Sequence, residues 1–179
     1  NQKKILAAGT VAGVLPGLPE LIRSVAWSPD GNTLLATTFN RPAAVLLEVA
    51  TQRARTVPLG AEGAAVAFGG SIAAVATESG TVVLVDPRTA EPRHTLPAAD
   101  ALPVHGVAFV GGRLAAAGGD GVLRLWTLDP PRLARTIPTA SPLHRLDAER
   151  AGTRLAGGGA LDGSVLVIEV TDRGAPPSF

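Results

Sequence analysis

The side chains with the most obvious capacity for chemistry are three histidines, because imidazole transfers protons and binds metal ions near neutral pH. His105 and His144 occupy matching places, two residues before the end of a short apolar motif, Val-x-x-Val or Leu-x-x-Leu. Arg23 and Ala64 occupy the same place in two similar segments, whereas His94 falls in a polar segment and is expected to be solvated. A metal site needs several ligands that converge at bonding distance. Two imidazoles without a fixed carboxylate do not meet that need, so the sequence predicts no metal ion.

The acidic residues, serines and glycines show no catalytic pattern. Asp30, Asp120 and Asp162 each precede a glycine, which turn chemistry alone explains. No spacing selects a carboxylate pair for acid–base catalysis. No serine lies in a Gly-x-Ser-x-Gly elbow, and the glycines at 157–159 lack the Lys-Ser or Lys-Thr of a phosphate loop. The sequence therefore predicts a protein that is not an enzyme, with no catalytic residue and no cofactor.

The composition indicates a globular chain without a strong field of one sign. Of the 179 residues, 46% are hydrophobic and 17% are charged, and the formal net charge is +1. Such a balance does not favour nucleic acid as a partner. No apolar run approaches the roughly 20 residues of a membrane-spanning helix, so no membrane insertion is expected. The sequence has no cysteine and no methionine, and we expect it to be a processed chain or part of a longer one.

The elements that must position the polar residues come from an internal repeat. A short apolar strand that enters a Gly-rich turn recurs about every 40 residues, which is a period typical of propeller blades. The equivalent positions in the four copies are Val25, Val66, Val107 and Leu146. We expect these four residues to be buried on inner strands. We expect three aromatic residues to pack between neighbouring blades: Trp27, Phe68 and Phe109.

Each repeat contains enough apolar runs and turns for four antiparallel strands. In the third copy, 114–117 leads through Asp120-Gly121 to 122–126, and Asp-Gly between apolar runs is a strong hairpin signal. A more polar strand with alternating charge follows in the first three copies and suits an outer edge. The predicted fold is therefore an all-β propeller of about four four-stranded blades. An immunoglobulin-like sandwich does not predict four copies of one turn order. The predicted repeats are 22–60, 63–97, 104–138 and 143–170, within a single domain over 1–179.

The repeat resembles the WD40 family of β-propellers over about Val11–Val170. The segment Ser28–Gly31 after an apolar strand and the segment Leu123–Trp126 after Asp120-Gly121 carry the likeness. The family's terminal Trp-Asp pair falls on Leu47-Glu48, Val85-Asp86, Trp126-Thr127 and Ile168-Glu169, and none of the four is a full match. The family's Gly-His before the first strand is missing. The resemblance implies degenerate repeats in a scaffold for protein–protein interaction.

The fourth copy ends without a fourth strand, because Pro176-Pro177 cannot donate to a sheet ladder. The apolar segment 11–16 is the predicted replacement, an outer strand that closes the ring. Two alternatives stay open: four blades completed by a second copy or a partner, and four blades of a larger propeller.

Function in such a scaffold is expected at the loops of one face, with a protein as partner. In a ring, Arg23, His105 and His144 would gather at one mouth of the central channel. The predicted binding residues are Arg23, Phe39, Arg41, Glu78, His105, His144 and Arg145. Self-association, or completion by further blades, is a further possibility for the partner. The alternative function is a propeller enzyme, such as a metal-dependent hydrolase with its site at the channel mouth.

Overall fold

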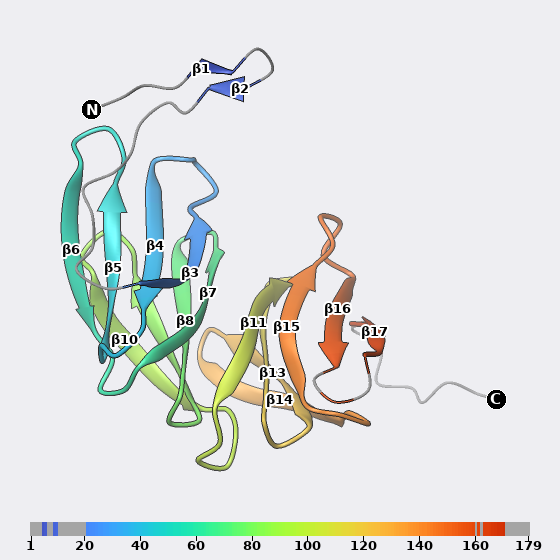
Figure 1. The fold of residues 1–179 in the computed structure, drawn as a ribbon. Coiled ribbons are helices and arrows are strands. Elements are labelled where there is room, and N and C mark those ends of the chain that lie inside the picture. Colours follow the sequence, from blue (N-terminus) through green and yellow to red (C-terminus); the bar gives the residue numbers. More distant parts are fainter. Residues whose placement is uncertain (1–4, 7–8, 11–20, 160, 162, 171–179) are drawn as a thin grey trace.

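The computed structural model describes residues 5–6, 9–10, 21–159, 161 and 163–170. Two short strands, β1 (Ile5–Leu6) and β2 (Gly9–Thr10), form an antiparallel pair. The remaining strands form four separate antiparallel sheets, and the described residues contain no helix. The sheets follow one another along an arc (Figure 1). This arrangement confirms the prediction of an all-β fold built from propeller blades.

Each sheet is a simple meander in which the inner strand comes first in the chain. The first blade contains β3 (Ile22–Trp27), β4 (Thr33–Thr38), β5 (Ala43–Glu48) and β6 (Arg53–Pro58). The second contains β7 (Gly63–Gly69), β8 (Ile72–Thr77), β9 (Thr81–Asp86) and β10 (Glu91–Pro97). The third contains β11 (Val104–Val110), β12 (Arg113–Gly118), β13 (Val122–Leu128) and β14 (Pro131–Pro138). The fourth contains β15 (Leu143–Ala148), β16 (Arg154–Gly159) and β17 (Val165–Glu169).

The core consists of three apolar layers, one between each pair of neighbouring blades. Because side chains alternate between the two faces of a strand, each inner blade contributes to two layers. Val66 and Val75 of the second blade pack toward Leu35 of the first. Ala74 and Leu84, on the other face, belong to the layer shared with the third blade. Small side chains on the second strands allow the sheets to lie close together.

Burial of the predicted core residues depends on whether a preceding blade is present. Val66 and Val107 are buried as expected, and Leu146 is half-buried. The prediction is wrong for the first copy, because Val25 and Trp27 are each 56% exposed. Both side chains lie on the face of the first blade that points away from the second. No other described blade covers that face, so the same register position is exposed here and buried elsewhere.

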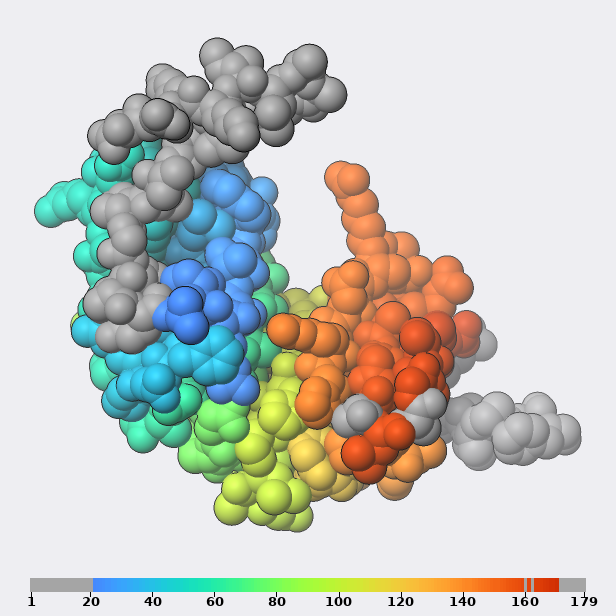
Figure 2. All heavy atoms as spheres, viewed as in Figure 1, coloured from blue at the N-terminus to red at the C-terminus, as the bar shows by residue number. Residues whose placement is uncertain are grey.

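The two ends of the arc do not meet within the part of the chain that the structure describes. The strands of the first blade do not pack against those of the fourth, and the two blades lie apart (Figures 1 and 2). The outer edge of β17 has no partner strand among the described residues. The segment 11–16, predicted to close the ring, lies outside the described residues. Closure by that segment therefore stays a prediction.

Candidate functional site

The inner strand of every blade contains one bulge at the same place. The antiparallel pairing with the second strand skips a position between Ile22 and Ser24 in the first blade, and likewise in the other three. The skipped residues are Arg23, Ala64, His105 and His144. A bulge interrupts the normal alternation and re-aims a side chain, often beside a functional site. The matching sequence positions are therefore the bulge positions of the four blades. Three of them carry polar side chains: Arg23, His105 and His144.

The two bulged histidines lie side by side, one from the third blade and one from the fourth. The ring centroids of His105 and His144 are 4.5 Å apart, with their planes tilted by 38°. Burial lowers the pKa of His105 below its ordinary value, and the nearby charges of His144, Arg23 and Arg145 lower it further. The carboxylate of Glu78 opposes this shift. The half-buried imidazole of His105 is therefore held mainly in its neutral form at neutral pH.

Arg23 joins the first two blades at the same end of the inner strands. Its guanidinium forms an ion pair with Glu78, which follows the end of β8, and it lies 5.2 Å from the centre of the Phe39 ring. Arginine over an aromatic face is a favourable cation–π arrangement. Oε1 of Glu78 is buried. It contacts the Arg23 guanidinium as an ion pair, but no donor in the described part of the chain has hydrogen-bond geometry toward it.

The structure brings together six of the residues predicted from the sequence. Direct contacts or electrostatic interactions connect Arg23, Phe39, Glu78, His105, His144 and Arg145. Arg41 is half-buried in the loop between β4 and β5, two residues after Phe39. His94 is exposed on the outer strand β10. We call the six connected residues the mouth cluster, since they lie where the inner strands begin.

Sequence reasoning missed an apolar rim around this cluster. Three exposed leucines lie in loops at the same end of the blades: Leu21, Leu102 and Leu161. Leu21 accepts a hydrogen bond from Phe39 through the backbone, Leu102 lies beside Gly119, and Leu161 donates from its backbone to Ser141. In the sequence, these residues are visible only as single leucines within polar or Pro-containing loops, a pattern that does not indicate a shared surface. Exposed apolar side chains that gather beside polar groups mark protein-binding surfaces.

The mouth cluster offers polar recognition rather than a recognisable set of metal ligands. Among the described residues, no group of three or more histidine, cysteine, aspartate or glutamate side chains could hold a metal ion. No helix in the described part of the chain is long and apolar enough to cross a membrane.

The pKa of His105 predicts a pH dependence of stability. The unfolded chain takes up a proton near the ordinary pKa of 6.5, whereas folded His105 takes it up only at lower pH. Stability contributed by this residue is therefore complete above that value and is lost as the pH falls toward the folded pKa. Denaturant unfolding between about pH 8 and pH 5 should show a smaller loss for His105→Asn than for the original chain. An equal loss in both proteins would contradict this assignment.

Comparison with known proteins supports the propeller and the WD40 resemblance. Residues 9–41 match the family model described as "WD domain, G-beta repeat". The computationally designed Ika4 protein superposes with a TM-score of 0.76 at 20% identity, over 88% of this chain and 96% of that one. A chain of the mitotic checkpoint complex gives 0.74 at 22% identity, over 83% and 47%. The RRP9 WD40 repeats give 0.72 at 17% identity, over 88% and 53%. No curated protein matches the sequence.

These comparisons confirm the resemblance to WD40 repeats and the blade architecture. The chain spans nearly the whole of the designed protein, but only about half the length of the checkpoint-complex and RRP9 chains. The four blades therefore follow the curvature of about half of those larger propellers.

Proposed function

We propose that the protein is a non-catalytic scaffold that binds a segment of a protein partner at the mouth cluster. Four stacked sheets give a rigid support, while the loops at the ends of the strands can vary without disturbing the core. Proteins of this fold include a chain solved within the mitotic checkpoint complex, which is an assembly of proteins. That likeness supports a protein as the kind of partner.

The observation that carries the proposal is a polar centre surrounded by exposed apolar side chains. Arg23 and Glu78 are both partly buried, and their charges are held at the entrance of the inner strands. Phe39 and the three rim leucines surround this centre with exposed apolar area. Aromatic and arginine side chains are favoured anchors of protein interfaces, and a polar group beside them fixes the orientation of the partner.

The charges of the mouth cluster favour a partner segment that combines apolar and acidic side chains. Arg145 is exposed beside His144, and both lie in the fourth blade. The single carboxylate, Glu78, is already paired with Arg23. An incoming carboxylate would meet Arg145 and the histidines, while apolar side chains would contact the rim leucines. No grouping among the described residues favours the alternative of a metal-dependent hydrolase.

The test is a set of peptides selected from a displayed random library against the original protein. In the triple variant Arg23→Ala, His105→Ala, His144→Ala, we expect affinity for the selected peptides to fall at least about tenfold, which corresponds to about 1.4 kcal/mol. Because Arg23→Ala leaves the buried Oε1 of Glu78 without its cation, the free energy of unfolding should fall by about 1–3 kcal/mol, so affinity is measured under conditions in which the variant is folded.

The matched control removes three cations from the opposite ends of the strands. Arg88, Arg132 and Arg150 are exposed there, and replacing all three with Ala should leave peptide affinity unchanged. The proposal is overturned if this control loses affinity while the mouth variant keeps it.

A further inference from the structure

Trp27 occupies a blade-to-blade contact position but has no blade to contact among the described residues. Phe68 and Phe109 occupy the same register position, each pairing with the second strand one residue before the turn region. Phe68 packs in the layer between the first and second blades, and Phe109 packs in the layer between the second and third. Trp27 pairs with Leu34 in the same manner, yet its side chain is 56% exposed. It is an inter-blade side chain that lacks its receiving surface.

The receiving surface is visible where the third blade meets the second. Phe109 lies in the layer that contains Ala67, Ala74 and Leu84 of the second blade. Its ring also covers Gly69 so closely that a Cβ atom there would collide with it. An inter-blade aromatic is therefore received by a socket with contributions from the first, second and third strands of the preceding blade.

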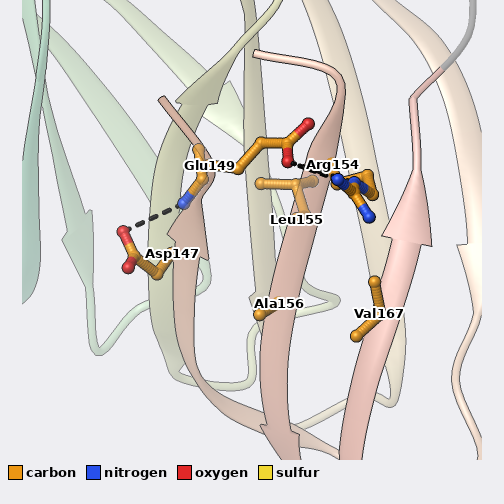
Figure 3. Close-up of a pocket in the computed structure, with 7 residues that line it drawn as sticks. Asp147, Glu149, Arg154, Leu155, Ala156 and Val167 are labelled. Carbon is orange, nitrogen blue, oxygen red and sulfur yellow. Dashed lines mark hydrogen bonds and ion pairs between the residues drawn. The ribbon is translucent and has the colours of Figure 1, made fainter. Parts of the chain in front are cut away.

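The fourth blade carries the equivalent positions, and no described blade covers them. One difference affects the fit: Glu149 stands where the second blade has Gly69, so an incoming ring must lie beside the Glu149 side chain rather than over that position as Phe109 does. The register places four of its residues at the socket positions: Asp147, Glu149, Ala156 and Val167. These residues, together with Arg154, line a hollow of about 370 Å³ (Figure 3). Glu149 is ion-paired with Arg154 at one end, and Asp147 accepts a hydrogen bond from the backbone of Ala148. Val165 and Val167 of β17 are exposed on this blade.

We propose that a second copy of this chain covers both free faces, with Trp27 of each copy in the hollow of the other. The four blades superpose on about half of the checkpoint-complex and RRP9 chains, so the space left in a ring of that curvature is about the size of one more copy. The first and fourth blades lie at opposite ends of the arc (Figure 1). Two copies related by a two-fold axis would therefore form two identical junctions and close the ring.

The chemistry of the hollow suits an indole. Val167 and Ala156 offer apolar contact to the ring, and the carboxylates of Asp147 and Glu149 can accept the indole N–H hydrogen bond. The guanidinium of Arg154 can lie against the ring face. Val25, on the same face as Trp27, would add apolar contact beside the exposed valines of β17. The two junctions form together, so each strengthens the other.

Sedimentation of the purified chain tests the proposal. We expect a particle of twice the 18.1 kDa chain mass, and Trp27→Asp should return the mass to that of one chain. Leu133→Asp is the matched control, because Leu133 is exposed to a similar degree on the third blade, away from both ends of the arc. A single-chain mass up to about 0.1 mM, where a micromolar interface is populated, would overturn the proposal. Assemblies larger than two copies would also overturn it.

Cross-linking tests the contact independently of the mass. The chain contains no cysteine, so engineered thiols are the only targets of a short bis-maleimide reagent. A mixture of Trp27→Cys and Glu149→Cys chains should give a covalent dimer, because these positions correspond to the contacting Phe109 and Gly69. A mixture of Leu133→Cys and Glu149→Cys chains should not. Equal cross-linking in the two mixtures would overturn the proposed junction. Peptide binding at the mouth cluster is measured separately and does not depend on this result.

Discussion

Val107→Asp is expected to destabilise the protein by more than about 4 kcal/mol, enough to unfold a typical domain in part or in full. Val107 is 5% exposed and lies in the layer shared by the second and third blades. A carboxylate there would lose its hydration and find no cation in the apolar layer. Denaturant titration followed by circular dichroism measures the effect directly.

Val25→Asp is the matched control for this prediction. Val25 has the same register position in the first blade but is 56% exposed, so its carboxylate would keep its water. In dilute protein, where association does not contribute, we expect a change within about 1 kcal/mol. Equal unfolding midpoints for the two variants would show that the assigned strand register is wrong.

Asp120→Ala is expected to cost about 3 kcal/mol, because it leaves a largely buried cation with only the exposed carboxylate of Asp100, 4.0 Å away, as an ionic partner among the described residues. Arg124 is 12% exposed and Asp120 is 9% exposed at their side chains, and the two form an ion pair in the third blade. Arg124 also donates a hydrogen bond of 2.7 Å to the carbonyl oxygen of Ala98, which connects the second and third blades. Loss of the carboxylate therefore weakens a joint between blades as well as one turn. Calorimetry or denaturant unfolding would measure the loss.

A second substitution separates the ion pair from the turn. In the double variant Asp120→Ala, Arg124→Leu, the unpaired charge is absent, and most of the lost stability should return. Glu149→Ala provides the comparison, because its partner Arg154 is 56% exposed and the pair is worth at most about 1 kcal/mol. The interpretation fails if the double variant is less stable than Asp120→Ala alone.

The blade architecture could be predicted from the sequence because it follows from local patterns. Apolar alternation, the Gly-containing turns and the recurrence of Val66 and Val107 at one register position are all visible in one dimension. The exposure of Val25 and Trp27 could not be predicted in the same way. It depends on a neighbouring blade, and a repeat pattern does not say whether the first copy has one.

The candidate site was only partly accessible to sequence reasoning. Matching places of His105 and His144 indicated a shared position, but the bulge that presents their side chains is a property of strand pairing. The ion pair of Asp120 with Arg124 was also missed, since a residue before glycine is fully explained by turn chemistry. Contacts between blades join residues far apart in sequence, and no spacing rule identifies them.

The most direct test of the proposed binding site is a map of amide chemical shifts during titration with one selected peptide. We predict that the changes concentrate at the starts of the inner strands and in the rim loops, including the amides of Arg23, Phe39, Glu78, His105 and Leu102. The amides of Gly31, Gln52 and Arg88, at the other ends of the strands, should not shift. Changes confined to that opposite end, with the mouth cluster unaffected, would contradict the account.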